Sequence, residues 1–199
     1  MATQTRTKPD TRNHRPREGA GSTGALIGAA AAGIAVGLAA NFGRKLAVQA
    51  PTAMAGDWMT ALVAEHQAAL KLFDALEATT SKNTTKRSML LAQLKHALAK
   101  HALEEENVIY PALREAGEKD GADHLNHEHG YVKQYLYELE AMPKESTRFL
   151  EKLAEFRSAI EKHMREEEDD LFPSLKARLS AEKNKHLTTL MNKEGFKLA

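Results

Sequence analysis

The feature that most constrains this chain is an eleven-residue pattern that occurs twice. Residues 101–111 and residues 163–173 both read H-x2-E-E-E-x3-aromatic-P. In each copy the histidine precedes the middle glutamate by four residues. Residues four apart lie on the same face of a helix, so each pair can reach towards one centre. The pairs are His101 with Glu105 and His163 with Glu167.

A lone histidine precedes each copy and repeats with almost the same offset. His129 follows His66 by 63 residues, while His163 follows His101 by 62. The chain therefore contains two copies of one unit, a helix with a histidine followed by a helix with a histidine and a glutamate. The predicted metal ligands are His66, His101, Glu105, His129, His163 and Glu167.

The apolar periodicity of the body predicts an all-α fold. Continuous β-type alternation is missing after residue 56, and apolar residues recur at helical spacing. Short polar loops near 78–84 and 117–121 indicate antiparallel neighbours, hence an up-down-up-down four-helix bundle over residues 57–175. All six candidates fall on the inward stripes of these helices.

Helix ends are also indicated. Asp57 is a predicted N-cap, and Met142-Pro143 should break the third helix. Pro111 is expected to kink or end the second helix, and the fourth should end near Pro173. A short helix and tail are predicted over residues 176–199, with Ser180 as the cap and Gly195 as the stop.

The two inward glutamates favour a metal site over an ordinary polar core. A lone histidine on an apolar stripe is more often a hydrogen-bonded core residue than a ligand. An ionised glutamate in a bundle core, however, costs several kcal/mol unless a cation or a metal neutralises it. No Lys or Arg falls on these stripes at the level of Glu105 or Glu167. Four imidazoles and two carboxylates suit iron, manganese or zinc, and two iron ions are the expected occupants.

The remaining glutamates and histidines of these segments are predicted to lie elsewhere. The flanking glutamates of each run should face solvent, namely Glu104 or Glu106 and Glu166 or Glu168. His96 and His186 are predicted to lie on the surface. His124 and His127 should lie near the start of the third helix, off the face of His129, although an irregular turn would bring one of them inward.

The repeated His … H-x2-E-E-x4-aromatic-P pattern resembles the hemerythrin-like, or HHE cation-binding, domain family over about residues 57–175. The resemblance implies a non-haem di-iron centre in a four-helix bundle. It assigns ligand roles to His66, His101, His129 and His163 and bridging roles to Glu105 and Glu167. Oxygen-carrying members have a fifth histidine where this chain has Leu125, so one iron would lack a protein ligand for reversible oxygen carriage unless water, His124 or His127 takes that place.

The predicted function is binding or sensing of dioxygen or of a related small molecule such as nitric oxide or peroxide. Tyr110 or Tyr131 is expected near the open coordination position. A di-iron oxidase that handles iron or peroxide is the first alternative. Ferritin-like oxidases carry E-x-x-H pairs, and no histidine here has a glutamate three residues before it. A non-enzymatic role is therefore favoured.

The N-terminal part leaves several interpretations open. Residues 1–23 resemble a disordered basic tail. Residues 24–43 of the Ala/Gly-rich segment 24–50 carry no charge and would span about 30 Å as a helix. This predicted helix could insert into a membrane, pack or self-associate, or be a cleaved signal. A membrane-attached interaction module is thus a second alternative function.

Composition excludes some classes of protein. The net charge of +1 provides no general attraction to nucleic acid, and no nucleic-acid partner is predicted. The absence of cysteine excludes disulfides, zinc fingers and cysteine-held iron–sulfur clusters. The predicted location is cytoplasmic, with attachment to the inner membrane left open by residues 24–43.

Overall fold

The computed structural model describes Met1, Lys45, Gln49, Thr52 and residues 54–199. From Lys45 onward these residues belong to one compact unit of the chain, residues 42–199. The uncharged segment 24–43 and the predicted basic tail, apart from Met1, lie outside the described residues. No helix within the described part of the chain is long and apolar enough to cross a membrane.

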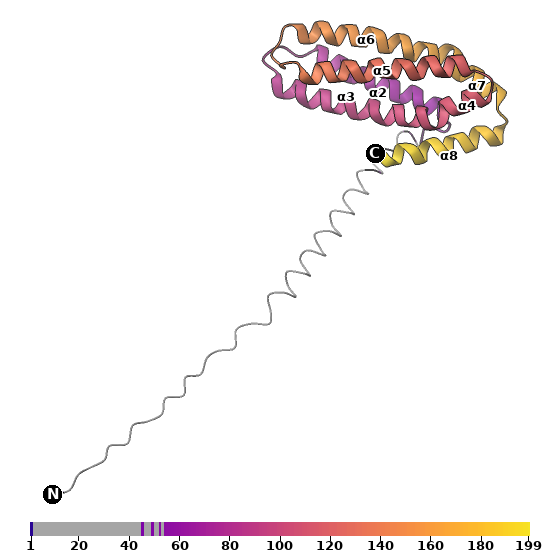
Figure 1. Ribbon diagram of the computed structural model, residues 1–199, viewed down its shortest axis with the longest axis horizontal. Coiled ribbons are helices and arrows are strands. Elements are labelled where there is room, and N and C mark those ends of the chain that lie inside the picture. The colour runs from indigo at the N-terminus through magenta and orange to yellow at the C-terminus, as the bar shows by residue number, and fades with distance from the viewer. Residues whose placement is uncertain (2–44, 46–48, 50–51, 53) are drawn as a thin grey trace. The chain divides into compact units, whose positions relative to one another are not determined.

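The regular structure of the described residues is entirely helical (Figure 1), which confirms the all-α prediction for this part of the chain. The long helices of the bundle are α2 (Trp58–Glu77), α3 (Thr84–Glu104), α5 (Lys119–Ala141) and α6 (Arg148–Glu166). A π-helical segment and a short α-helix continue α3, namely η1 (Glu105–Ile109) and α4 (Tyr110–Glu115). The same pair of elements continues α6, namely η2 (Glu167–Leu171) and α7 (Phe172–Arg178), and α8 (Ala181–Leu198) follows.

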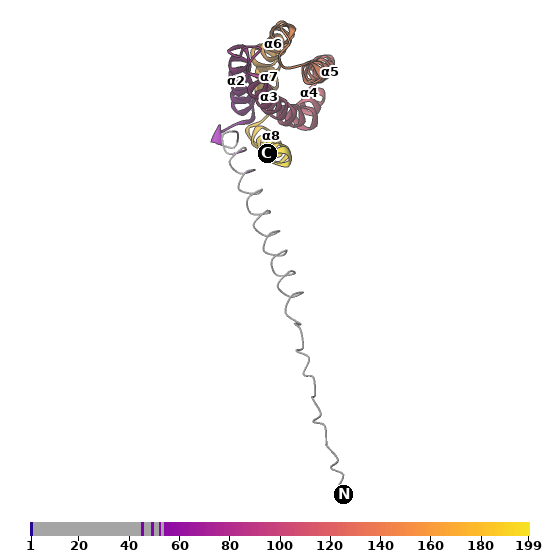
Figure 2. The same cartoon turned by 90° about the vertical axis from the view of Figure 1, so that its left-hand side faces the viewer.

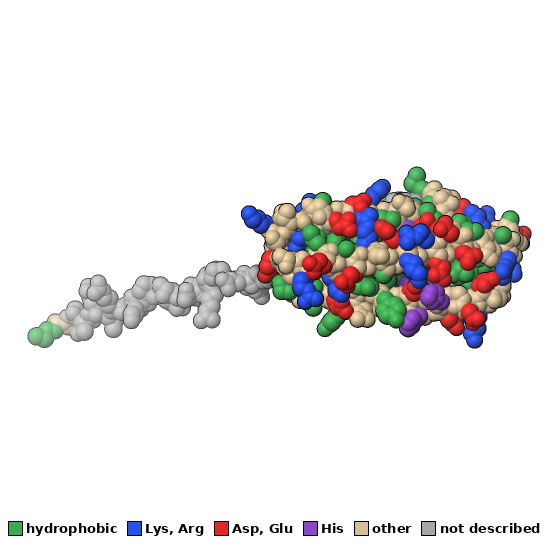
Figure 3. Space-filling view, turned by 90° about the horizontal axis from the view of Figure 1, so that it is seen from above, with side chains coloured by type: hydrophobic (Ala, Val, Ile, Leu, Met, Phe, Trp, Pro, Cys, Tyr) green, Lys and Arg blue, Asp and Glu red, His purple; other side chains and the backbone are tan. Residues whose placement is uncertain are grey.

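The long helices surround a shared interior. α2 packs against α3 and α6, and α5 packs against the same two helices, as the end-on view of Figure 2 shows. α8 lies along the outside of the bundle, in contact with α3, η1 and α2. On the face shown in Figure 3, basic and acidic side chains are interspersed with hydrophobic ones.

Two apolar clusters fill the interior. One contains Trp58, Tyr110, Leu125 and Phe172 together with residues of α4, α7 and α8. The other is built from the opposite halves of the four long helices and is centred on Phe73, Leu94, Leu139, Phe149 and Phe156. Each fully buried Leu or Phe side chain contributes about 1.5–3 kcal/mol through loss of apolar surface from water. A polar layer separates the two clusters.

Several predicted helix ends are confirmed. Asp57 caps α2 by accepting hydrogen bonds from the backbone N–H groups of Met59 and Thr60 at 3.1 and 3.2 Å. Ser180 caps α8 in the same way, and α5 ends at Ala141, just before Met142-Pro143.

The predicted ends at the prolines and at Gly195 need correction. The regular α-helix does end near Pro111, at Glu104, but the chain stays helical through η1 and α4. In the wide turn of η1 the Tyr110 N–H donates to the Glu105 carbonyl, five residues back. This turn takes up an extra residue immediately before Pro111, which has no N–H of its own to donate. The second copy behaves alike and remains helical past Pro173, and α8 continues through Gly195 to Leu198.

Candidate metal centre

The six predicted ligands lie together in the polar layer between the two apolar clusters. All six are buried: Glu105 and Glu167 are 0% exposed, and His101, the most exposed, is 6%. They form two groups of four, and within each group the potential ligand atoms lie within 4.8 Å of one another. The groups are His66, His101, Glu105 and Glu167, and Glu105, His129, His163 and Glu167.

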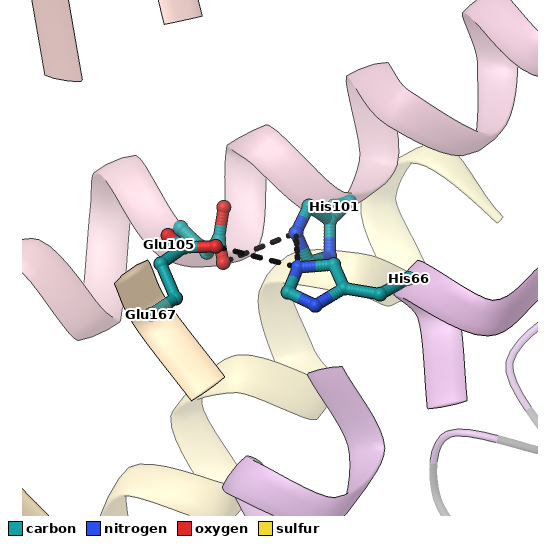
Figure 4. Close-up of side chains that lie close together, drawn as sticks. All are labelled: His66, His101, Glu105 and Glu167. Atoms are coloured by element: carbon teal, nitrogen blue, oxygen red, sulfur yellow. Dashed lines mark hydrogen bonds and ion pairs between the residues drawn. The ribbon is translucent and has the colours of Figure 1, made fainter. Parts of the chain in front are cut away.

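The first group joins α2 and α3 to the two glutamates (Figure 4). His66 Nε2 lies 2.9 Å from His101 Nε2 and 3.3 Å from Glu167 Oε2. His101 Nε2 lies 3.1 Å from Glu105 Oε1, one helical turn further along the chain. Both imidazoles therefore direct the same ring atom towards the pair of carboxylates.

The second group brings α5 and α6 to the same two carboxylates. His129 Nε2 lies 3.3 Å from Glu105 Oε2, and His163 Nε2 lies 3.5 Å from Glu167 Oε2. Each glutamate consequently faces one histidine of its own half and one of the other half. Both carboxylates are therefore shared by the two groups of potential ligand atoms.

Both π-helical segments begin at these glutamates, η1 at Glu105 and η2 at Glu167. Single π turns within helices are often found at functional sites. After the first of them, Tyr110 is fully buried and its hydroxyl group enters the polar layer. The hydroxyl lies 2.8 Å from Glu167 Oε1, 3.0 Å from His129 Nε2 and 3.3 Å from Glu105 Oε2. Burial and the two carboxylates raise the pKa of Tyr110 well above its usual value, so the hydroxyl keeps its proton.

A carboxylate contacts the outer ring nitrogen of every histidine in the centre. The partners of Nδ1 are Glu168 for His66 at 2.6 Å, Glu65 for His101 at 3.1 Å, Glu106 for His129 at 2.9 Å and Glu128 for His163 at 2.9 Å. A carboxylate on one nitrogen orients the ring and directs the other nitrogen at a metal. All four rings therefore present Nε2 to the interior.

The prediction that only the middle glutamate of each run faces inward is wrong. Glu104 is 0% exposed, while Glu106 and Glu168 are 28% and 26% exposed and contact His129 and His66. Glu65 was also missed as a functional residue. A signal was available, because a glutamate directly precedes both lone histidines and another directly follows both middle glutamates.

Glu65 and Glu104 share a buried cation that the helical pattern did not reveal. Lys100 is 5% exposed, donates to Glu104 Oε1 at 2.9 Å and forms an ion pair with Glu65. Burial raises the pKa of Glu65, but His101 and Lys100 outweigh it and lower this pKa to about 2. Lys100 and Glu65 thereby connect His101 to the α8 side of the bundle, where Gly195 lies against Glu104.

Carboxylate neighbours raise the pKa of three histidines of the centre, namely His66, His101 and His129. Burial alone would lower the pKa of His129, but hydrogen bonds with Glu105 and Glu106 raise it to about 9. The pKa of His66 and that of His101 are raised for the same reason, against burial, by Glu167 and Glu168 and by Glu105 and Glu65. Ring nitrogens that attract a proton so strongly in this field will also attract a metal cation.

The donor set fits a pair of metal ions. Among the described residues, three ligand atoms of the centre are buried without a hydrogen-bond partner, namely Glu105 Oε1, Glu167 Oε2 and His163 Nε2. These atoms have the histidine–glutamate contacts of 3.1–3.5 Å given above but no hydrogen bond. Burial without a hydrogen bond is costly, and a metal ion would satisfy them. Imidazole nitrogen and carboxylate oxygen together suit iron, manganese and zinc.

The other histidines that the structure describes lie outside the centre. His96 and His186 are exposed, as predicted, and so are His124 and His127. The irregular turn that would bring one of the latter two inward is therefore not observed. Tyr131 is 53% exposed, contacts His127 and lines a surface groove together with His163. Leu125 is fully buried, in the apolar cluster that also contains Tyr110.

Comparison with known proteins identifies the family. A family model described as the hemerythrin HHE cation binding domain matches residues 59–175. An uncharacterized hemerythrin-like protein of Schizosaccharomyces pombe is 36% identical over 96 residues, which make up 46% of this chain and 47% of that protein. A DNA nickase of Nostoc sp. is 26% identical over 113 residues, or 57% of this chain and 32% of that protein.

The chain thus spans less than half the length of either of these relatives. No solved structure matches it. The family match includes all six candidate ligands and more than half of the sequence. The chain belongs to the hemerythrin HHE cation-binding domain family.

Proposed function

We propose that the centre holds two iron ions and that the loaded protein binds or senses dioxygen or a related small molecule such as nitric oxide or peroxide. The observation that carries this proposal is the sharing of Glu105 and Glu167 between two groups of potential ligand atoms. One ion would be held by His66 and His101 and the other by His129 and His163, with both glutamates common to the two.

Iron is preferred to the other metals that fit these donors because of the function proposed. Zinc and manganese are compatible with imidazole and carboxylate ligands. Reduced iron, when bound, supplies redox chemistry and an open coordination position for a small ligand. Leu125 has no donor atom, so the ion at His129 and His163 gains no further ligand from that position. We assign to Tyr110 the role of hydrogen-bond donor beside that open position.

The bundle that supports this centre is inferred to have the up-down-up-down arrangement. The loop between α2 and α3 spans residues 78–83 and that between α5 and α6 spans 142–147. Connections of this length join antiparallel neighbours. In this arrangement each half of the chain supplies one histidine pair and one bridging glutamate.

A binding or sensing role is proposed rather than an oxidase role. No histidine of the sequence has a glutamate three residues before it, whereas ferritin-like oxidases use that spacing. The activity in the name of the Nostoc protein is not transferred, because the match covers only 32% of that protein.

Metal analysis after anaerobic loading with ferrous iron tests the proposal. The expected result is about two iron ions per chain, with a change in visible absorption when dioxygen or nitric oxide is added. His101→Ala and His163→Ala should each lower the iron content to about one ion or less, because each removes a ligand from a different ion. The matched control is His127→Ala, which removes an exposed histidine outside the centre. Wild-type protein that binds one ion or fewer, with no change in His101→Ala, would contradict the proposal.

A further inference from the structure

A groove between α3 and α5 leads from the surface to one histidine of the centre. Its volume is about 290 Å3, and its lining residues include Leu98, Ala102, Val132 and Leu136. His129 lies at its inner end together with its carboxylate partner Glu106. The walls near the histidine are therefore apolar.

A second groove lies on the other side of α5, between α5 and α6. Its volume is about 260 Å3, and it is lined by Val132, Tyr135, Ile160 and other residues. It reaches His163 and the partner carboxylate of that histidine, Glu128. The histidines of α5 and α6 are thus each approached from outside by a separate groove.

A small cavity lies between the ends of these grooves. Its volume is about 10 Å3, which is room for roughly one water-sized molecule. All four histidines of the centre contribute to its lining, and the rest of the wall consists of apolar residues: Leu98, Ala102, Val132, Ile160 and Met164.

Val132 is the residue that the three spaces have in common. It lines both grooves and the inner cavity, and no other residue lines both grooves. It follows His129 by three residues on α5, hence on the same side of the helix. Its side chain is partly buried. Leu98 and Ala102 also border both the inner cavity and the first groove, and Ile160 borders both the cavity and the second groove, but among the described residues only Val132 borders all three spaces.

We propose that Val132 is the gate through which a small uncharged molecule reaches the metal position of His129 and His163. This inference rests on the proposed function above and names the route and the residue that controls it. Apolar walls favour an uncharged molecule such as dioxygen or nitric oxide. Glu106 and Glu128 also line the grooves, but each lies beside a lysine, Lys133 at 2.9 Å and Lys162 at 3.6 Å, so neither carboxylate presents an unpaired charge.

Within the described part of the chain, the histidines of α2 and α3 are placed differently with respect to these grooves. His66 and His101 line the inner cavity but neither of the two grooves beside α5. A third groove, between α2 and α3, has a volume of about 290 Å3 but shares no lining residue with the inner cavity. Its lining includes Ala68, which offers a matched control position.

The test compares Val132→Ala, Val132→Phe and Ala68→Phe in the full chain loaded with ferrous iron. The rate of nitric oxide binding is measured by stopped-flow absorption. Val132→Ala should bind faster and Val132→Phe slower than wild type by about tenfold, equal to about 1.4 kcal/mol in the entry barrier. Ala68→Phe fills a groove of similar size and should leave the rate unchanged, and the iron content should be the same in all four proteins.

A second measurement is independent of iron chemistry. Crystals of the zinc-loaded chain are placed under xenon, which occupies apolar cavities. Xenon beside residue 132 is expected in wild type and Val132→Ala and should be absent in Val132→Phe. Equal nitric oxide rates in the Val132 variants, or xenon unaffected by Val132→Phe, would overturn the gate. Wild-type protein that fails to bind nitric oxide would instead overturn the proposed function, while the xenon measurement still decides on the gate.

Discussion

At the scale of single residues, the directions of the four imidazoles depend on glutamates that are not themselves predicted ligands. Glu65 and Glu128 each orient the second histidine of their own half, while Glu106 and Glu168 each orient the lone histidine of the other half. Each half of the chain thus supplies one orienting carboxylate to a histidine of its own half and one to a histidine of the other half. Metal affinity should respond to changes in these residues even though they lie outside the predicted ligand set.

Replacement of Glu128 by glutamine tests this dependence. Glu128→Gln keeps the size of the side chain but removes the carboxylate that orients His163, so the affinity for zinc should fall by about 10- to 100-fold. Affinity is measured by competition with a chromophoric chelator. Glu155→Gln, at an exposed position away from the centre, is the control and should retain wild-type affinity. Equal affinities of the two variants would show that the outer carboxylates do not support metal binding.

The raised pKa of His129 predicts opposite pH dependences for metal binding and for the stability of the metal-free protein. The pKa is about 9 in the folded chain against a usual 6.5, so the stabilisation from this group is complete below pH 6.5 and is lost as the pH rises through 9. A metal ion must displace that proton, so zinc affinity should increase over the same interval.

Urea unfolding of metal-free protein and calorimetric zinc titration, each between pH 6 and about 9.5, test these two trends. At acid pH the lowered pKa of Glu65 predicts the opposite trend, a loss of stability as the pH falls. Its pKa is about 2 in the folded chain against a usual 4.5, so its contribution is present above pH 4.5 and disappears as the pH falls towards 2. Zinc affinity that stays constant from pH 7 to 9 would mean that no histidine proton is displaced.

The difference between the predicted and observed roles of the glutamates has a geometric cause. A regular helix turns by about 100° per residue. If only the direction towards the bundle axis counts as inward, the residues next to an inward residue are therefore predicted to face solvent. In a bundle, two adjacent helices flank every helix, and a residue turned by 100° faces one of them. Glu106 follows Glu105 and reaches α5 for this reason. Periodicity could place the six inward residues in one layer, but it could not indicate which neighbouring helix would receive Glu106 or Glu168.

At the scale of elements, the close contact of α8 with the bundle depends on a glycine. Gly195 is buried, and a Cβ atom at this position would lie 1.6 Å from Glu104 Oε1 and 2.7 Å from Gln49 Oε1. Burial, followed by repulsion from Glu65, raises the pKa of Glu104 to about 8, and Lys100 opposes this change. Any displacement of Glu104 by α8 would therefore disturb the pairing of Lys100 with Glu65.

Gly195→Ala should destabilise the protein even though alanine is the better helix former. Overpacking against Glu104 should cost about 1–3 kcal/mol in the free energy of unfolding. Gly130→Ala in α5 is the matched control, because nothing lies within 4 Å of the Cβ that it adds. The control should gain about 0.5–1 kcal/mol, the usual advantage of alanine over glycine within a helix. Urea unfolding measures both, and a stabilising effect of Gly195→Ala would show that Glu104 moves aside without cost.

Helix ends that depend on local sequence are predicted better than features that depend on tertiary contacts. Asp57, Met142-Pro143 and Ser180 mark ends that local chemistry determines, and these ends are observed. The π turns and the continuation of α8 past Gly195 depend on tertiary contacts instead. Gly195 resembles a helix stop in isolation, but its lack of a side chain serves the approach of α8 to Glu104.

At the scale of the whole molecule, the two halves of the repeat are covered differently. Lys100 and Glu104 of the first half are buried, and Glu104 lies against α8. Their counterparts in the second half, Lys162 and Glu166, have side chains that are 67% and 30% exposed. The grooves beside α5 also reach only the histidines of the second half. The six candidate ligands are thus arranged almost symmetrically, but the residues around them differ between the two halves.

This asymmetry predicts that two bound metal ions leave at different rates. An ion held by His129 and His163 would lie next to the two grooves, whereas an ion held by His66 and His101 would lie on the side where Lys100 and Glu104 are buried. Removal of zinc by excess chelator, measured by the absorption of the chelator complex, should therefore show two phases of equal amplitude. Val132→Ala should accelerate only the fast phase, because it widens the route beside α5. Gly195→Ala should accelerate only the slow phase, because it displaces Glu104 and loosens the support of His101. A single phase, or equal acceleration of both phases by either variant, would mean that the surrounding residues do not make the two metal positions release zinc at different rates.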